Sequence, residues 1–119
     1  MLDGLFGVCR LESDAPIPSW AHGGPFSSIT RTADELSVVC PQDVVPEGVT
    51  YEPDWRCLRV AGTIAFSAVG VLASLTAPLT EAGISVFAIS TFDTDYLLVK
   101  GEDLERAVAV LRRRGHTIA

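Results

Sequence analysis

The chain has 119 residues and a mass of 12.7 kDa; 48% of its residues are hydrophobic and 20% are charged. This is an ordinary globular balance, and the length suits one domain or two very small units that share a core. The net charge of -6 and the pI near 4.7 argue against nucleic acid as a partner, because phosphate binding needs a basic face.

The apolar runs, the N-terminus and the cysteines indicate in which cellular compartment the protein resides. No apolar run approaches the roughly 20 residues that a membrane span needs, and the N-terminus lacks the basic region and apolar core of a signal peptide. Cys9, Cys40 and Cys57 form no CxxC pair, and each lies in or beside an apolar run. His22 and His116 fall in unrelated segments without ligand spacing. We therefore predict a cytoplasmic protein with small buried thiols, no metal site, no cofactor and no membrane partner.

The first half begins with a predicted strand at Leu5–Leu11, followed by a short helical piece at Ser19–His22. Phe26–Arg31 and Glu35–Cys40 are two apolar runs around a polar turn, which predicts a β-hairpin. The stretch Pro41–Pro53 is rich in turn residues, and we predict that it is the linker between two halves.

The second half alternates strands and helices. Cys57–Ala61 is predicted as a strand and Phe66–Ala82 as a helix, with a kink or a loosened last turn at Pro78, which cannot donate a backbone hydrogen bond. Glu102–Arg114 carries an apolar stripe at helical spacing and predicts a second helix, and His116–Ala119 predicts a short last strand.

Between the two helices, Ile84–Val99 is the most informative stretch of the chain. It consists of two apolar runs separated by the turn Thr91–Asp95, and it predicts a β-hairpin with hydroxyls and two carboxylates at its bend. The order strand, helix, strand, strand, helix, strand is that of a ferredoxin-like unit. Small hydroxyls and carboxylates at such a bend could hold a small polar molecule.

The two hairpins form an internal repeat. Ile29–Val39 aligns with Ile89–Val99 at an offset of 60 residues, with apolar residues coinciding at both ends. An acid precedes the second strand in each, Glu35 and Asp95. We therefore predict an α+β fold of tandem ferredoxin-like (βαββαβ) units, with a degenerate unit over residues 1–54 and a complete one over residues 55–119. The alternative is chance similarity between two hairpins.

Several short segments of this sequence resemble the ACT-domain family, more narrowly the short tandem type related to the arginine sensors called CASTOR. The segments are Arg59-Val60-Ala61-Gly62, Leu72-Ala73-Ser74-Leu75 and Ala82 to Val99 in the second half, with Ser28 to Thr32 and Asp34 to Val39 in the first. The resemblance implies a non-catalytic βαββαβ domain that binds amino acids at interfaces between ACT units and regulates a partner protein. The sequence departs from many metabolic ACT domains after the first strand, where Gly62-Thr63-Ile64-Ala65-Phe66-Ser67 replaces an Asp-x-Pro-Gly word.

The resemblance also implies a ligand site built from two segments. The loop ahead of the first helix would contribute Gly62, Thr63, Ile64, Phe66 and Ser67, and the hairpin bend would contribute Ser90, Thr91, Phe92 and Asp95.

Residue chemistry is compatible with that site but leaves alternatives. The start of a helix suits an α-carboxylate, Asp93 or Asp95 could pair with an ammonium group, and the Phe92 ring could cover an aliphatic stem or a cation. Alternatively, the two carboxylates only shape the turn, Phe92 packs in the core or at an interface, and Ser67 is a helix cap. We expect Asp93 and Asp95 to lie outside the apolar core.

The sequence therefore predicts a regulatory protein that binds an amino-acid-like molecule and assembles at least as a homodimer. The dimer follows from the open sheet edge that a four-stranded unit leaves. Two other classes remain: a ligand-free interaction module, and a small enzyme. The enzyme is disfavoured because no residue lies in a recognisable nucleophile or general-base motif.

Overall fold

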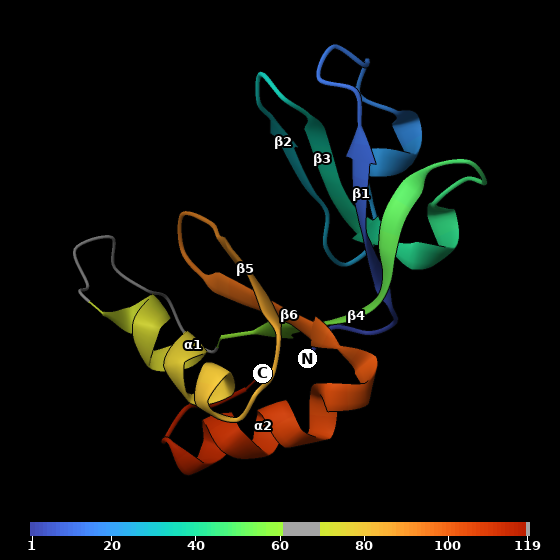
Figure 1. The fold of residues 1–119 in the computed structure, drawn as a ribbon. Coiled ribbons are helices and arrows are strands. Elements are labelled where there is room, and N and C mark those ends of the chain that lie inside the picture. The colour runs from blue at the N-terminus through green and yellow to red at the C-terminus, as the bar shows by residue number, and fades with distance from the viewer. Residues whose placement is uncertain (61–69, 119) are drawn as a thin grey trace. The chain divides into compact units, whose positions relative to one another are not determined.

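The computed structural model describes residues 1–60 and 70–118. The chain divides into two compact units: the first unit is Leu2–Trp55, and the second unit is Arg56–Ala119 together with Met1. The strand β4 (Thr50–Arg59) runs through the boundary between them (Figure 1).

The first unit is an antiparallel sheet without an α-helix. Its strands are β1 (Phe6–Leu11), β2 (Ser28–Arg31), β3 (Leu36–Pro41) and the first part of β4, joined by the short 3-10 turns η1 (Ser19–Ala21) and η2 (Gln42–Val44). β1 lies between β3 and β4, and β2 pairs with the other side of β3. The predicted first strand, helical piece and hairpin are all present.

Two apolar clusters stabilise the first unit. Cys9 on β1 packs with Leu36, Val38 and Cys40 on β3, and all four side chains are buried. Ala21 of η1 completes this cluster. Loop residues, among them Ala15, Val45 and Val49, pack against it in place of an α-helix. Separately, the rings of Phe6 and Phe26 meet edge to face with centroids 6.1 Å apart.

The predicted linker is wrong. Pro41 still belongs to β3, Gln42–Val44 form η2, and β4 already begins at Thr50. Pro53 and Asp54 lie where the β1–β4 register shifts, and Asp54 has a φ of 69°. A bulge accommodates a proline inside a strand, because the residue there need not donate to the ladder.

Gln42 fixes this bulge by two hydrogen bonds. Its Oε1 accepts from the backbone N–H of Asp54 at 2.6 Å, and its Nε2 donates to Asp54 Oδ1 at 3.1 Å. The turn residues of the supposed linker therefore shape a strand, and the strand predicted at Cys57–Ala61 begins seven residues earlier.

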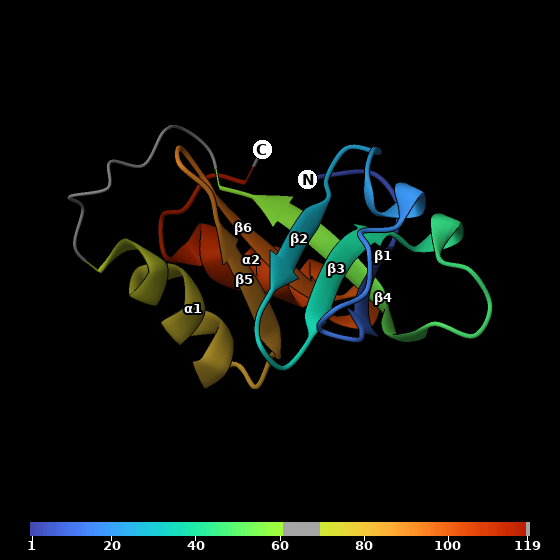
Figure 2. The same cartoon turned by 90° about the horizontal axis from the view of Figure 1, so that it is seen from above.

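The second unit places two helices on one face of its strands (Figures 1 and 2). Its elements are the end of β4, α1 (Val71–Glu81), β5 (Val86–Ser90), β6 (Asp95–Lys100), the 3-10 turn η3 (Gly101–Asp103) and α2 (Leu104–Arg113). The core joins Leu58 of β4 and Leu97 of β6 to Leu79 of α1 and Leu111 of α2, all fully buried.

The helix boundaries differ in detail from the predicted ones. Gly70 has a left-handed φ of 76° and α1 begins after it, at Val71, while residues 61–69 lie outside the described part. Pro78 lies within α1, which continues to Glu81. The predicted last strand is a single bridge between Val60 and Ile118.

Candidate functional site

The hairpin β5–β6 closes with a four-residue turn. Ser90 and Asp95 are the last paired residues of the two strands. Beyond them the Thr91 N–H donates to the Thr94 carbonyl at 2.8 Å, and the Thr91 hydroxyl donates to the same oxygen at 3.0 Å. The turn is thus closed by backbone and side chain together, which fixes the positions of the residues around it.

Asp95 is a buried carboxylate. The residue is only 8% exposed, and Ser90 Oγ donates to the Asp95 Oδ1 at 2.5 Å. Burying a carboxylate is costly unless hydrogen bonds satisfy it. Asp95 was expected outside the apolar core, and it is not among the residues of the hydrophobic cluster of the second unit. It is nevertheless buried at the start of β6.

The other acid and the aromatic ring of the turn are exposed. Phe92 is 76% exposed, so the interpretation as packing in this chain's core is wrong. Asp93, the second carboxylate that could pair with an ammonium, is also exposed. The bend therefore presents an aromatic ring and a carboxylate outward, with a second carboxylate buried below the turn.

The buried carboxylate lies beside the end of β4. The Asp95 carbonyl accepts a hydrogen bond from the Val60 N–H at 3.0 Å. Val60 is the last described residue before the other predicted segment. The five residues predicted there, Gly62, Thr63, Ile64, Phe66 and Ser67, lie outside the described residues.

The two hairpins align by their turns at an offset of 59 residues rather than 60. Thr32 corresponds to Thr91, because the Thr32 N–H donates to the Glu35 carbonyl at 2.9 Å as the Thr91 N–H does to Thr94. Leu36, not Glu35, then corresponds to Asp95.

The new register extends through the following elements. β3 and β6 have the same burial pattern along their six residues, and η2 and η3 begin 59 residues apart. The second unit therefore has a buried acid where the first has Leu36, which is completely buried.

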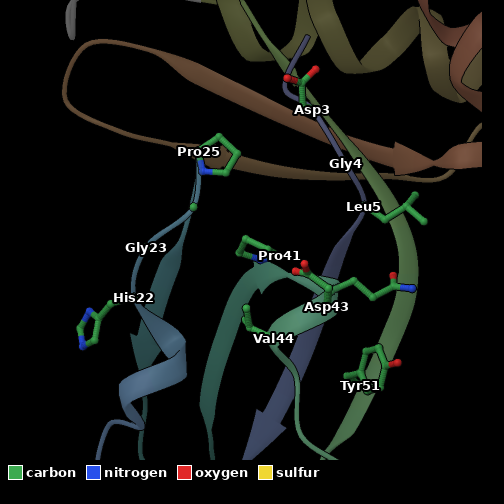
Figure 3. A pocket seen from close by; sticks show the side chains of 12 residues that line it. Asp3, Gly4, Leu5, His22, Gly23, Pro25, Pro41, Asp43, Val44 and Tyr51 are labelled. Atoms are coloured by element: carbon green, nitrogen blue, oxygen red, sulfur yellow. The ribbon is translucent and has the colours of Figure 1, made fainter.

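Sequence reasoning missed a cavity of about 1000 Å³ within the first unit, called here the first-unit cavity (Figure 3). Several separate loops and strand ends build it, so no local motif could have indicated it. Its lining residues are Asp3, Gly4, Leu5, His22, Gly23, Gly24, Pro25, Pro41, Gln42, Asp43, Val44 and Tyr51.

The three cysteines are buried free thiols, as predicted. Burial raises the pKa of Cys9 and of Cys57 to about 12, and it also raises the pKa of Cys40. A catalytic cysteine needs a lowered pKa, because the thiolate is the nucleophile. None of these thiols is therefore suited to nucleophilic catalysis.

Within residues 1–60 and 70–118, no group of three or more histidine, cysteine or acidic side chains is arranged to hold a metal ion. Neither α1 nor α2 is long and apolar enough to cross a membrane.

Comparison with known proteins identifies the fold and the family. A family model described as an ACT domain matches residues 50–113, which is more than half of the chain. The chain belongs to the ACT-domain family. A second model, of an N-terminal domain, matches residues 4–48.

The curated relatives are much longer than this ACT protein. The cytosolic arginine sensor for mTORC1 subunit 1 of Bos taurus is 38% identical over 129 aligned residues, which cover 96% of this chain and 37% of the sensor. The sensor of Rattus norvegicus is 32% identical and matches the whole chain, again over only 39% of its own length.

Solved structures share the fold. A protein of Agobacterium tumefaciens is 46% identical, with a TM-score of 0.90 over 96% of this chain and 85% of that one. The aspartate kinase of Clostridium acetobutylicum is 15% identical, with a TM-score of 0.69 over 92% of this chain and 32% of the kinase; this likeness concerns the fold alone. Together these matches confirm the ferredoxin-like ACT fold and the family resemblance read from the sequence.

Proposed function

We propose that this ACT protein is a non-catalytic regulatory protein that binds an amino-acid-like ligand at the β5–β6 turn. One observation carries the proposal: Asp95 is a buried acid at a position where the equivalent strand of the first unit has a buried leucine. A strand start in this fold does not require a carboxylate, and keeping one costs free energy. A binding role accounts for that cost.

The chemistry of the turn suits the cationic part of such a ligand. Asp95 would accept a hydrogen bond from an ammonium or guanidinium group, Ser90 and Thr91 would add hydroxyl contacts, and Phe92 would cover the aliphatic stem. From the sequence, the Gly62–Ser67 segment would contribute the donors for the α-carboxylate. This half of the site is proposed from the family resemblance.

The family supports a regulatory small-molecule-binding role, and two relatives are arginine sensors by name. A carboxylate that pairs with a cation is compatible with a basic amino acid. Arginine is therefore the first ligand to test for this chain. A regulated partner protein and a cytosolic location are part of the same proposal.

Thermal unfolding against the twenty amino acids tests the proposal. A ligand present at a hundred times its dissociation constant should stabilise the folded state by about 2.7 kcal/mol. Arginine or another amino acid should raise the melting temperature of the parent chain, and no response to any of them would favour a ligand-free interaction module instead.

A matched pair of variants tests the assignment of the residue. Asp95→Ala should weaken binding of the responding amino acid by roughly 2 kcal/mol, since hydrogen bonds to charged groups contribute about 1.5–3 kcal/mol. Asp93→Ala removes an exposed carboxylate two residues away and should matter less. Equal affinity in the parent and in Asp95→Ala would remove Asp95 from the site.

The non-catalytic part of the proposal has its own support in the raised pKa values of the three thiols. Turnover of an amino acid by the purified chain, without ligand-dependent stabilisation, would contradict it. We also propose a homodimer, because β5 carries no charged residue or proline that would protect a sheet edge. Light scattering that gives 12.7 kDa at micromolar concentration would exclude the dimer.

A further inference from the structure

The first-unit cavity has the size of a small-molecule site. Its volume of about 1000 Å³ lies at the upper end of the roughly 300–1,000 Å³ typical of ligand pockets. All of its lining residues belong to the first unit, and none of them belongs to the β5–β6 turn.

The carboxylates of Asp3 and Asp43 give the cavity a negative formal charge. His22 contributes a neutral imidazole in this count, and no lysine or arginine is among the lining residues. Within the part of the chain that the structure describes, neither carboxylate forms an ion pair. A concave surface lined by one sign of charge concentrates counter-ions, here cations, and repels anions.

Exposed apolar side chains are also among the lining residues. Leu5, Val44 and Tyr51 are 41%, 42% and 38% exposed, which is unusual for large hydrophobic residues gathered at one place. Figure 3 shows Asp43 and Val44 on one side of the cavity and Pro25 on the other. The cavity thus offers apolar contact area beside a negative charge.

Two glycines allow these walls to come together. A Cβ at Gly7 would lie 2.9 Å from Tyr51 Cδ2, so the absence of a side chain lets the tyrosine ring lie over β1. A Cβ at Gly24 would lie 2.4 Å from Pro41 Cγ, and the φ of 69° at Gly24 also favours glycine. The sequence therefore provides the close approach that shapes the cavity.

We propose that the first-unit cavity binds a small primary amine that has an apolar body and no carboxylate. The ammonium group pairs with Asp43, with Asp3 adding to the negative field, and the apolar body contacts Leu5, Val44 and Tyr51. An amino acid binds less well, because its carboxylate meets no lysine or arginine in this lining.

Calorimetric titration of the full chain with phenethylamine tests the proposal. Phenethyl alcohol has the same apolar body without the charge, and phenylalanine adds the carboxylate. We expect phenethylamine to bind at least tenfold more tightly than either. Equal binding of the alcohol would show that the charge has no part in recognition, and equal binding of phenylalanine would overturn the exclusion of carboxylates.

Two variants locate the site. Asp43→Asn should weaken phenethylamine binding about tenfold, which corresponds to 1.4 kcal/mol. Asp34→Asn, in the β2–β3 turn of the same unit, makes the same change of charge away from the cavity and should bind as the parent does. Both residues are exposed, so neither change should disturb folding. An unchanged affinity in Asp43→Asn, or no heat of binding in the parent, would overturn the proposal.

This inference is independent of the amino-acid site. The variant Asp95→Ala should bind phenethylamine as the parent does, even if it no longer responds to amino acids. Loss of phenethylamine binding in Asp95→Ala would place the amine at the β5–β6 turn and would contradict the assignment to the first-unit cavity.

Discussion

The hairpins β2–β3 and β5–β6 have the same backbone turn but different chemistry at it. Both turns are closed by a threonine N–H that donates to the carbonyl three residues later, at 2.9 Å for Thr32 and 2.8 Å for Thr91. Below the turn, the paired residues are Arg31 and Leu36 in the first hairpin, but Ser90 and Asp95 in the second. One backbone design thus supports an apolar structural position in one unit and a buried acid in the other.

The first hairpin uses its side chains to hold nearby loops. Arg31 donates to the backbone carbonyls of Ser13 and Ala15, and Arg10 donates to the carbonyl of Asp34 at 3.2 Å. In the second hairpin, Ser90 instead donates to Asp95. The turn therefore forms with a buried leucine at this position in the first unit, so the buried acid of the second unit calls for a separate reason.

Exchanging the acid into the first hairpin should have the largest effect. Leu36→Asp removes a fully buried leucine and places a carboxylate among Cys9, Val38 and Cys40 without a serine beside it. Truncating a buried leucine alone costs about 2–5 kcal/mol. Burying the carboxylate adds to that, because its cross-strand neighbour Arg31 already donates to the carbonyls of Ser13 and Ala15. We expect the free energy of unfolding in urea to fall by roughly 4 kcal/mol or the chain not to fold.

Leu36→Ala is the control for this exchange, because it leaves a cavity without a charge. If Leu36→Asp were as stable as Leu36→Ala, the position would tolerate a carboxylate, and the contrast between the two hairpins would lose its meaning.

The buried thiols make the stability of both units depend on alkaline pH. Burial raises the pKa of Cys57 from 9.0 to about 12, so the folded state keeps the proton that the unfolded chain loses above pH 9. The stability is therefore present below pH 9 and is lost as the pH rises toward 12. At pH 10 the loss should be about 1.4 kcal/mol for one thiol.

Urea unfolding at pH 8 and pH 10 measures this contribution. Cys57→Ala should lose less stability than the parent between these two values. Cys9→Ala tests the first unit in the same way, since the pKa of Cys9 is also raised to about 12, by burial first and then by Cys40. The same pH dependence in the parent and in both variants would show that burial does not keep these thiols protonated in the folded state.

The sequence predicts the two hairpins well, but it does not predict their exact register or the environment of their side chains. Alternating apolar runs around a polar turn are a local signal, so both hairpins and the family were predicted. The register was predicted one residue off, because Glu35 and Asp95 look equivalent as acids before a strand. The hydrogen bonds of Thr32 and Thr91 set the true register at 59.

Non-local features could not be predicted. Asp95 reads as a turn residue, and only its pairing with Ser90 and the bond to Val60 show that it is buried. The turn residues between Pro41 and Pro53 resemble a linker. In the structure, Gln42 accepts a hydrogen bond from the Asp54 N–H and thereby stabilises a bulge within β4. The first-unit cavity has no sequence signal, because its walls come from segments far apart along the chain.

The threonines that close the two turns should differ modestly in their contribution to stability. Both hydroxyls donate to the carbonyl three residues later, Thr32 to Glu35 at 3.4 Å and Thr91 to Thr94 at 3.0 Å. The Thr32 hydroxyl also accepts from the backbone N–H groups of Asp34 at 3.1 Å and Glu35 at 3.2 Å. A hydrogen bond contributes about 0.5–1.5 kcal/mol net. Thr32→Val should therefore destabilise the chain by about 1 kcal/mol and Thr91→Val by less, as measured by urea unfolding. A larger loss in Thr91→Val would reverse this ranking.

The reverse exchange, Asp95→Leu, should have the smallest effect on stability. It separates a structural role of Asp95 from a role in ligand binding. It places in β6 the residue that β3 already has at the equivalent position, within a unit whose core is rich in leucine. Removing one partner of a hydrogen bond is costly when the other partner stays buried and unsatisfied, but Ser90 is exposed enough to bond to water instead. The free energy of unfolding should change by less than about 1 kcal/mol, while any stabilisation by an amino acid disappears. A chain that loses both stability and binding would show that Asp95 is structural, and one that keeps both would show that the acid serves neither purpose. Only loss of binding with stability retained agrees with an acid that is kept for a ligand.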